Sequence, residues 1–288
     1  MPLERRFALP GLTLAAREWG DEDGMPVLAL HGWLDNAGSF DLLAPHLPGC
    51  RVVALDAAGH GASDFRSPDS GYNLSQDVGD LIDVADALGW ARFRFIGHSR
   101  GAAIGTLLAG TYPERIEQLV LIEGGLPLVD PPERAPERLR EALRGKRELA
   151  GRTGRVFPDR AQALAERAAG FTKVTLRAAE VLARRSLIEV DGGFTWRADQ
   201  RLKAASDVRY TLEQVRAFVE RITAPVLMFR ATQSPFSGLP EYDEILPSFR
   251  SIEVVQLDGG HHLHLEGAEA EIGRRIVEFF REPKPSSD

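Results

Sequence analysis

The stretch FRFIGHSRGAAIG, residues 93–105, has one serine between two glycines, after an apolar run and before a series of small residues. This order predicts a buried strand, a sharp turn and a helix. In such a turn Ser99 is lifted above the sheet, and Gly97 and Gly101 let the strand and the helix approach closely. The pattern favours Ser99 as a nucleophile over a serine that only caps the helix.

Three further runs in the first half of the chain resemble the run before Ser99. They are almost continuously apolar, and each ends in glycine or a polar turn, at residues 26–32, 51–59 and 119–125. Such runs are typical of strands in a parallel sheet that is covered on both faces. Apolar residues at helical spacing in 75–89, and the segment after Ser99, place helices between them. The alternation predicts a doubly wound α/β fold with a mostly parallel sheet.

The pattern changes between residues 127 and 223, where arginine, alanine and glutamate dominate. Here we expect several amphipathic helices of modest length rather than sheet. Apolar runs return at 224–232 and 251–260, before a final helix. The sequence therefore predicts an α/β core (1–126), an inserted helical cap (127–223) and a second part of the core (224–288).

Length and composition limit the classes of function. A chain of 288 residues can bury a sizeable core, and its formal net charge of −7 disfavours a nucleic-acid partner. No apolar stretch is long enough for a membrane span, and the N-terminus has no secretory signal, so we expect a cytoplasmic protein. The single cysteine, Cys50, can form no internal disulfide and is expected to be buried. The sequence leaves open whether the chain forms a homodimer.

A serine hydroxyl needs a base, and the segment DGGHHLHLE offers three histidines directly after the last predicted strand. We favour His261, because the preceding glycine pair can turn it over the edge of the sheet toward Ser99. His262 is expected to point elsewhere, and His264 to pack near the start of the final helix. The alternative is a metal site formed by the three imidazoles, but the sequence places no further ligand beside them, so we expect no metal.

The acid of a Ser-acid-His arrangement usually follows the strand that here reads PVLMFRAT, yet the next residues, QSPFSG, contain no carboxylate. Glu241 and Asp243 lie further along and are expected at an exposed helix start. Glu123 stands at the end of the buried run LVLIE, beside the strand that leads to Ser99. A glutamate buried there needs a partner, so we expect Glu123 to orient His261, with Asp258 as the weaker alternative.

The tetrahedral intermediate of acyl transfer needs backbone N–H donors. We expect one from Arg100, the residue after the nucleophile, and one from Trp33 in the loop LHGW. His31 in that loop is expected to be structural.

The substrate pocket is predicted to include Trp33, Arg100 and Trp196. Among the other aromatic residues of the predicted cap, Phe157, Phe171 and Phe194 are pocket candidates or form the cap's own core. Three possibilities stay open for the Arg100 side chain: an ion pair with Glu123, a contact with a polar group of the substrate, or exposure to solvent.

These motifs in this order, HGW, DAAGHGASD, GHSRG and GGHHLHLE, resemble the α/β-hydrolase superfamily over the whole chain. Residues 30–41, LHGWLDNAGSFD, are similar to the serine hydrolase-like (kraken) family, which also has an acidic residue after the LVLI strand. The resemblance implies a hydrolase with a Ser-acid-His triad, a helical cap and no cofactor. Haloalkane dehalogenases and epoxide hydrolases have aspartate where this chain has Ser99.

We therefore expect a serine hydrolase that cleaves a carboxylic ester, thioester or lactone of a small to medium, partly apolar substrate. Perhydrolysis and carbon–carbon hydrolysis use similar triads and are alternatives. A further alternative is a binding or regulatory protein on a hydrolase fold without turnover.

Overall fold

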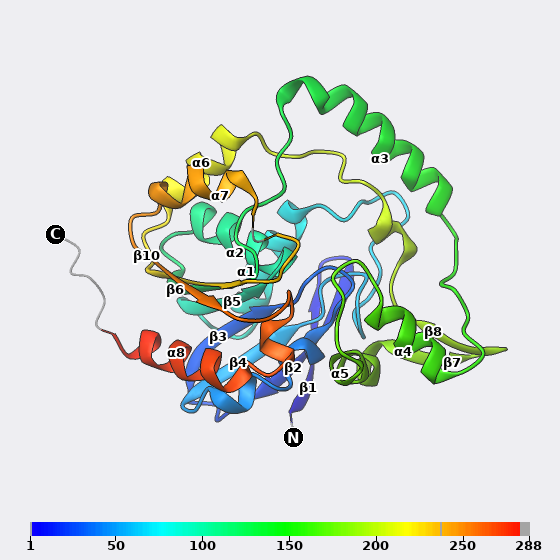
Figure 1. Cartoon of the computed structure of the whole chain (residues 1–288), viewed down its shortest axis with the longest axis horizontal. Helices are drawn as coiled ribbons and strands as arrows, with labels where there is room; N and C mark the ends of the chain where they lie inside the picture. The colour runs from blue at the N-terminus through cyan, green and yellow to red at the C-terminus, as the bar shows by residue number, and fades with distance from the viewer. Residues whose placement is uncertain (1, 237, 283–288) are drawn as a thin grey trace.

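The computed structural model describes residues 2–236 and 238–282, and an eight-stranded sheet forms its centre (Figure 1). In spatial order the strands are β1 (Leu3–Leu9), β2 (Leu12–Trp19), β4 (Cys50–Leu55), β3 (Met25–Leu30), β5 (Phe93–His98), β6 (Ile116–Ile122), β9 (Val226–Ala231) and β10 (Ile252–Leu257). Neighbours pair in parallel from β4 to β10, whereas β2 is antiparallel to both β1 and β4. The predicted mostly parallel α/β sheet is confirmed.

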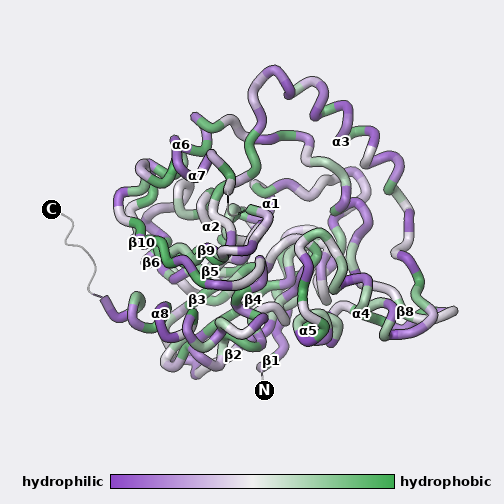
Figure 2. Tube along the Cα trace, viewed as in Figure 1, coloured by the Kyte–Doolittle hydropathy of each residue, from purple (hydrophilic) through white to green (hydrophobic). Residues whose placement is uncertain are grey.

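Both faces of this sheet are covered. Helices α1 (Leu74–Ala87), α2 (Arg100–Thr111) and α6 (Leu212–Arg221) contribute to the hydrophobic cluster on one face, and α8 (Glu269–Arg281) to the cluster on the other. Successive residues of β3 alternate between the two clusters. The central strands are therefore apolar at nearly every position (Figure 2), since successive side chains point to opposite faces.

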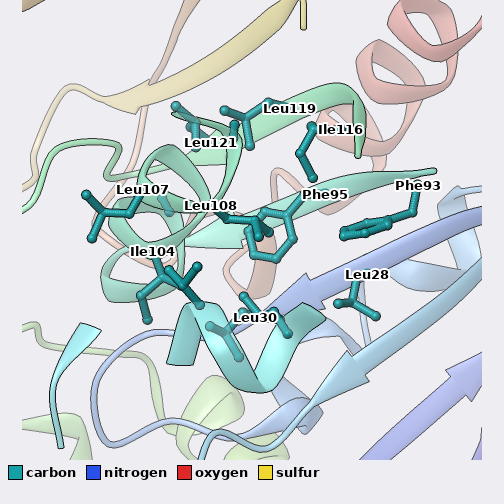
Figure 3. Packing of buried hydrophobic residues seen from close by; sticks show 14 of the residues in the cluster. Leu28, Leu30, Phe93, Phe95, Ile104, Leu107, Leu108, Ile116, Leu119 and Leu121 are labelled. Atoms are coloured by element: carbon teal, nitrogen blue, oxygen red, sulfur yellow. The ribbon is translucent and has the colours of Figure 1, made fainter. Parts of the chain in front are cut away.

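Helix α2 begins directly after Ser99, and its packing against the sheet fixes its position. Its side chains Ile104, Leu107 and Leu108 lie with those of β3, β5 and β6 in one cluster (Figure 3). All three are buried, and each contributes roughly 1.5–3 kcal/mol by leaving water. This packing holds the first turn of α2 at the carboxyl end of β5.

Between β6 and α6 the chain leaves the sheet. This inserted segment, residues 127–211, contains α3 (Ala135–Leu149), α4 (Arg160–Ala168), α5 (Leu176–Ser186), β7 (Leu187–Val190) and β8 (Gly193–Trp196). Helix α3 forms an outer arc away from the sheet in Figure 1 and is largely hydrophilic in Figure 2.

The expectation of helices rather than sheet is wrong at β7 and β8, which form an antiparallel hairpin. Gly192 and Gly193, with φ of 83° and 140°, provide the tight turn between them. The backbone of Phe194 also pairs with that of Phe157. The glycine pair therefore marks a turn between two strands here, and not a break between two helices.

Helix α6 lies inside the predicted cap, yet it packs against α2, and Val215 and Val219 belong to the cluster on the sheet. The division of the chain at residues 126 and 223 stays a prediction. The hairpin of β1 and β2 was not predicted, although Pro10 and Gly11 supply its turn. The remaining helix, α7 (Pro240–Ile245), follows β9. No helix among the described residues is both long and apolar enough to cross a membrane.

We predict opposite effects of two Gly-to-Ala substitutions on stability. A Cβ on Gly101 would lie 2.1 Å from the carbonyl oxygen of Leu30, so Gly101→Ala should lower the free energy of unfolding by about 4 kcal/mol or more. Gly79, on the exposed side of α1, has nothing within 4 Å, so Gly79→Ala should raise it by about 0.5–1 kcal/mol. Urea denaturation of both variants checks this, and similar values for the two would contradict the packing described.

Candidate active site

Ser99 forms the turn between β5 and α2. Its φ of 52° and ψ of −114° lie outside the regions that ordinary L-residues occupy. A Cβ on Gly97 would lie 2.5 Å from the carbonyl oxygen of Gly101, so a side chain there would prevent this turn. The Ser99 N–H donates to the Ile122 carbonyl at 2.9 Å, which ties the turn to the end of β6.

The structure brings Ser99, His261 and Glu123 together. Nε2 of His261 lies 2.8 Å from Oγ of Ser99, and Nδ1 lies 3.2 Å from Oε2 of Glu123. The other oxygen of Glu123 accepts from the N–H of Ala231 at the end of β9. His261 and Glu123 are 3% and 4% exposed, so their contact is shielded from water. This geometry lets Glu123 accept a hydrogen bond from Nδ1–H of His261 while Nε2 faces the serine hydroxyl.

Backbone strain is concentrated around this site. Among the described residues other than glycine, three have positive φ: Leu34 (61°), Ser99 (52°) and Glu123 (47°). Leu34 follows Trp33 in the loop after β3, and Glu123 follows the last residue of β6. Such conformations persist only where the surrounding structure imposes them, and they often mark functional sites.

The alternative acid, Asp258, faces away from His261. Its carboxylate accepts from Oγ1 of Thr232 at 2.7 Å and from Nε2 of Gln233 at 3.0 Å, on an exposed edge. Sequence reasoning missed Ser234, whose Oγ lies 3.4 Å from Nδ1 of His261. Ser234 belongs to the segment QSPFSG in which an acid was sought, and only its position after β9 could have indicated it.

The other two histidines of the cluster have separate partners. Nε2 of His264 lies 2.7 Å from Oγ of Ser39, and burial lowers the pKa of His264 to about 3, so its ring is neutral. His262 donates from Nε2 to Oδ2 of Asp35 at 3.0 Å. The three imidazoles therefore do not share one ligand position, as the alternative metal site required.

Asp35 is a buried carboxylate that lies close to the sequence neighbours of both Ser99 and His261. Besides His262, it accepts from Nη2 of Arg167 in α4 at 2.6 Å, and Nδ1 of His98 lies 3.7 Å away. His98 precedes Ser99, and its Nε2 donates to the carbonyl of His261 at 2.9 Å. Burial opposes the charge of Asp35, but His262 and Arg167 outweigh it and hold the pKa of the carboxyl well below its usual range.

Asp35, His98 and His262 are the group of described residues that could ligate a metal ion, with ligand atoms within 4.8 Å of one another. Arg167 already neutralises Asp35 at this position and lies 3.5 Å from Nε2 of His262. Asp35 thus already takes part in an ion pair between the inserted segment and the loop after β3, and we assign the group no metal.

Two backbone N–H groups are candidates for an oxyanion hole. Arg100 is the first residue of α2, where an N–H has no acceptor within the helix. Trp33 lies in the loop after β3, which His31 holds by accepting from the Ala57 N–H at 3.0 Å and donating to the Gly32 carbonyl at 2.7 Å. His31 thus has the structural contacts expected of it.

A cavity of about 670 Å³ contains Ser99 and His261 in its wall, together with Trp33 and Arg100. Phe171, a pocket candidate, lies in the wall too. Phe236 also lines the cavity, with its ring centroid 4.9 Å from that of His261, and was not predicted. The expectation for Trp196 is wrong: it does not line this cavity, because it pairs with Leu187 in the β7–β8 hairpin. Phe157 and Phe194 do not line it either.

The model of the alpha/beta hydrolase fold matches residues 25–268. This chain belongs to the α/β-hydrolase family. The chain is 31% identical to a serine hydrolase-like protein of Danio rerio, with 98% of this chain and 89% of that protein covered. It is also 31% identical to serine hydrolase-like protein 2 of Homo sapiens, with 91% and 89% covered. The predicted resemblance to the serine hydrolase-like family is confirmed.

Solved structures agree with this assignment. A hypothetical protein from Pseudomonas aeruginosa PAO1, known from its crystal structure, is 43% identical to this chain, with a TM-score of 0.92 and 97% of this chain and 99% of that chain covered. A thioesterase domain from the curacin biosynthetic pathway is 23% identical, with a TM-score of 0.86 and 96% and 99% covered, and shares the fold.

The Arg100 side chain is neither solvated nor paired with Glu123. Its guanidinium forms an ion pair with Asp77 in α1, and its side chain is 15% exposed. Glu123 is therefore left to His261 and the Ala231 N–H. Asp77 gave no sequence signal for this role beyond its place in the first turn of α1.

We predict that the Arg167–Asp35 pair stabilises the fold. Arg167→Met leaves a buried carboxylate with less compensation and should lower the free energy of unfolding by about 3 kcal/mol. Because the pKa of Asp35 is low in the folded state, this contribution is present above about pH 4 and is lost as the pH falls toward that pKa. Urea denaturation near neutral pH measures the loss.

The matched control is Arg155→Met, which breaks the exposed pair with Glu166 in the same inserted segment and should cost less than about 1 kcal/mol. The double variant Asp35→Asn with Arg167→Met should be more stable than the sum of the single effects predicts. Additive losses, or equal losses for Arg167→Met and Arg155→Met, would contradict this account.

Proposed function

We propose that this chain is a serine hydrolase that cleaves carboxylic esters, thioesters or lactones through an acyl-enzyme on Ser99. The observation that carries the proposal is the continuous contact from Ser99 Oγ through His261 to Glu123, with the serine in a strained turn at a cavity wall. The serine hydrolase-like name of the curated relatives supports the same class.

The geometry supports a two-step reaction. Nε2 of His261 takes the Ser99 proton as Oγ attacks the carbonyl carbon, and Glu123 stabilises the resulting imidazolium. The N–H groups of Trp33 and Arg100 stabilise the oxyanion. His261 then protonates the leaving alcohol or thiol, and water, activated by the same imidazole, releases the carboxylic acid.

The cavity supports a partly apolar substrate of small to medium size. Trp33 is 44% exposed, and its Nε1 donates to the Leu202 carbonyl at 2.9 Å, which connects the loop after β3 to the inserted segment. Phe171 and Phe236, with ring centroids 6.1 Å apart, add aromatic surface near His261. We propose that substrate binds between the sheet and the inserted segment, which then acts as a cap.

We predict that a fluorophosphonate probe labels the wild-type protein at Ser99, and that short p-nitrophenyl esters are hydrolysed. Ser99→Ala should abolish labelling and lower turnover by about 10⁴-fold or more, because the nucleophile is lost. Peptide mass spectrometry locates the label, and absorbance of p-nitrophenolate measures turnover.

The control is Ser234→Ala, which removes the other hydroxyl beside His261 and should leave the Ser99 label in place. An unlabelled, inert wild-type protein that is correctly folded would support a binding or regulatory role instead.

A further inference from the structure

The cavity that contains Ser99 also reaches helix α3 and the loop before helix α1. Lys146, in the last turn of α3, and Gly71 and Asn73, in that loop, all line it. A methyl group added to Gly71 would lie 3.4 Å from Nζ of Lys146 and 3.5 Å from Nδ2 of Asn73. Two nitrogen donors from separate elements therefore converge on one point of the wall.

Asn73 is the N-cap residue of helix α1. Its N–H donates to Oε1 of Gln76 at 3.1 Å, and its backbone carbonyl accepts from the N–H of Gln76 at 3.1 Å. These two contacts hold the backbone of Asn73 at the cavity wall. Its Nδ2 group, like Nζ of Lys146, lies close to the position that a Cβ on Gly71 would take.

Lys146 differs from the other cationic residues of the wall. Among the described residues, the other lining cations have partners: Arg100 with Asp77, Arg201 with Asp199, Arg209 with Asp130, and Lys203 with the amide oxygen of Gln200. No hydrogen bond or ion pair joins the side chain of Lys146 to another described residue. An unpaired cation in the wall of a partly apolar cavity attracts an anionic ligand group.

The nearby carboxylates do not neutralise Lys146. Asp69 is fully exposed, and its pKa is lowered chiefly by the Ser67 hydroxyl, with a smaller contribution from Lys146. Asp207 lines the cavity as well, but within the described residues it forms no ion pair with Lys146. Helix α1 also begins beside this point, and the N–H groups and dipole of a helix N-terminus favour negative charge.

We propose that Lys146 and Asn73 form an anion subsite, so that the substrate is an ester whose remote end carries a carboxylate or phosphate. This inference rests on the proposed function of Ser99. The ester group lies at Ser99, the apolar middle of the substrate contacts the wall of the cavity, and the anionic end accepts hydrogen bonds from Nζ and Nδ2. Monoesters of dicarboxylic acids have this chemistry.

The test compares kcat/KM for p-nitrophenyl monoesters of dicarboxylic acids of graded length with uncharged esters of the same length. A parallel series that ends in phosphate distinguishes the two anions. Lys146→Met, which keeps the length of the side chain, should lower kcat/KM for the preferred anionic series by about ten- to a hundredfold, mainly through KM. It should change the uncharged esters by less than about twofold.

Three further variants sharpen the comparison. Asn73→Asp keeps a good N-cap but replaces the donor with a negative charge, and should also lower kcat/KM for anionic esters. Lys146→Arg should restore most of the preference. Lys203→Met, at an exposed lysine that already has a partner, should leave the ratio of anionic to uncharged kcat/KM unchanged.

Equal effects of Lys146→Met on anionic and uncharged esters, or no effect on either anionic series, would overturn the anion subsite while leaving ester hydrolysis intact. Failure of the proposed function has a different signature, since every ester would then be inert and Ser99 unlabelled. Calorimetric titration with glutarate or inorganic phosphate tests the subsite without turnover. We expect the wild-type protein to bind one of the two anions, and Lys146→Met to weaken that binding at least tenfold. Equal binding to the wild type and the variant, or no binding to either, would overturn the anion subsite.

Discussion

Strand β5 and helix α2 meet at Ser99 with almost no space between them. Gly97 faces the Gly101 carbonyl, and Gly101 faces the carbonyls of the residues that end β3 and begin the next loop. The positive φ of Ser99 is sustained because the buried side chains of α2 hold the helix against the sheet. This close approach places the serine hydroxyl at the sheet edge, where the loops after β3, β6 and β10 supply the other candidate groups.

The parts of the site that follow parallel strands were predictable from the sequence. Continuous apolar runs located these strands, and the residue after each run, such as Glu123 after β6, had to lie at the same edge. Partners of long side chains were not predictable. Arg100 pairs with Asp77, and Arg167 with Asp35, across separations in the sequence that no local pattern specifies.

The inserted segment was predicted less well because part of its attachment depends on ion pairs between residues that are far apart in the sequence. Arg167 of α4 and Arg185 of α5 reach the buried carboxylates Asp35 and Asp56, at 2.6 and 2.7 Å. These contacts, with the bond from Trp33 to Leu202, join the inserted segment to the loops after β3 and β4. Trp33, Asp35 and Leu202 also line the cavity, so the inserted segment is attached to the loop that holds one of the two proposed oxyanion donors, Trp33.

The proposed reaction depends most directly on Glu123, the group that orients His261. In Glu123→Gln, Oε1 can still accept from the Ala231 N–H, so Nε2 would donate to Nδ1 of His261 and leave the wrong imidazole tautomer facing Ser99. The deciding measurement is therefore the kcat of ester hydrolysis for Glu123→Gln beside Asp258→Asn, with folding checked by circular dichroism. We predict a loss of about 10⁴-fold for Glu123→Gln and less than about twofold for Asp258→Asn. Near-normal turnover of Glu123→Gln, or a larger loss in Asp258→Asn, would contradict the account.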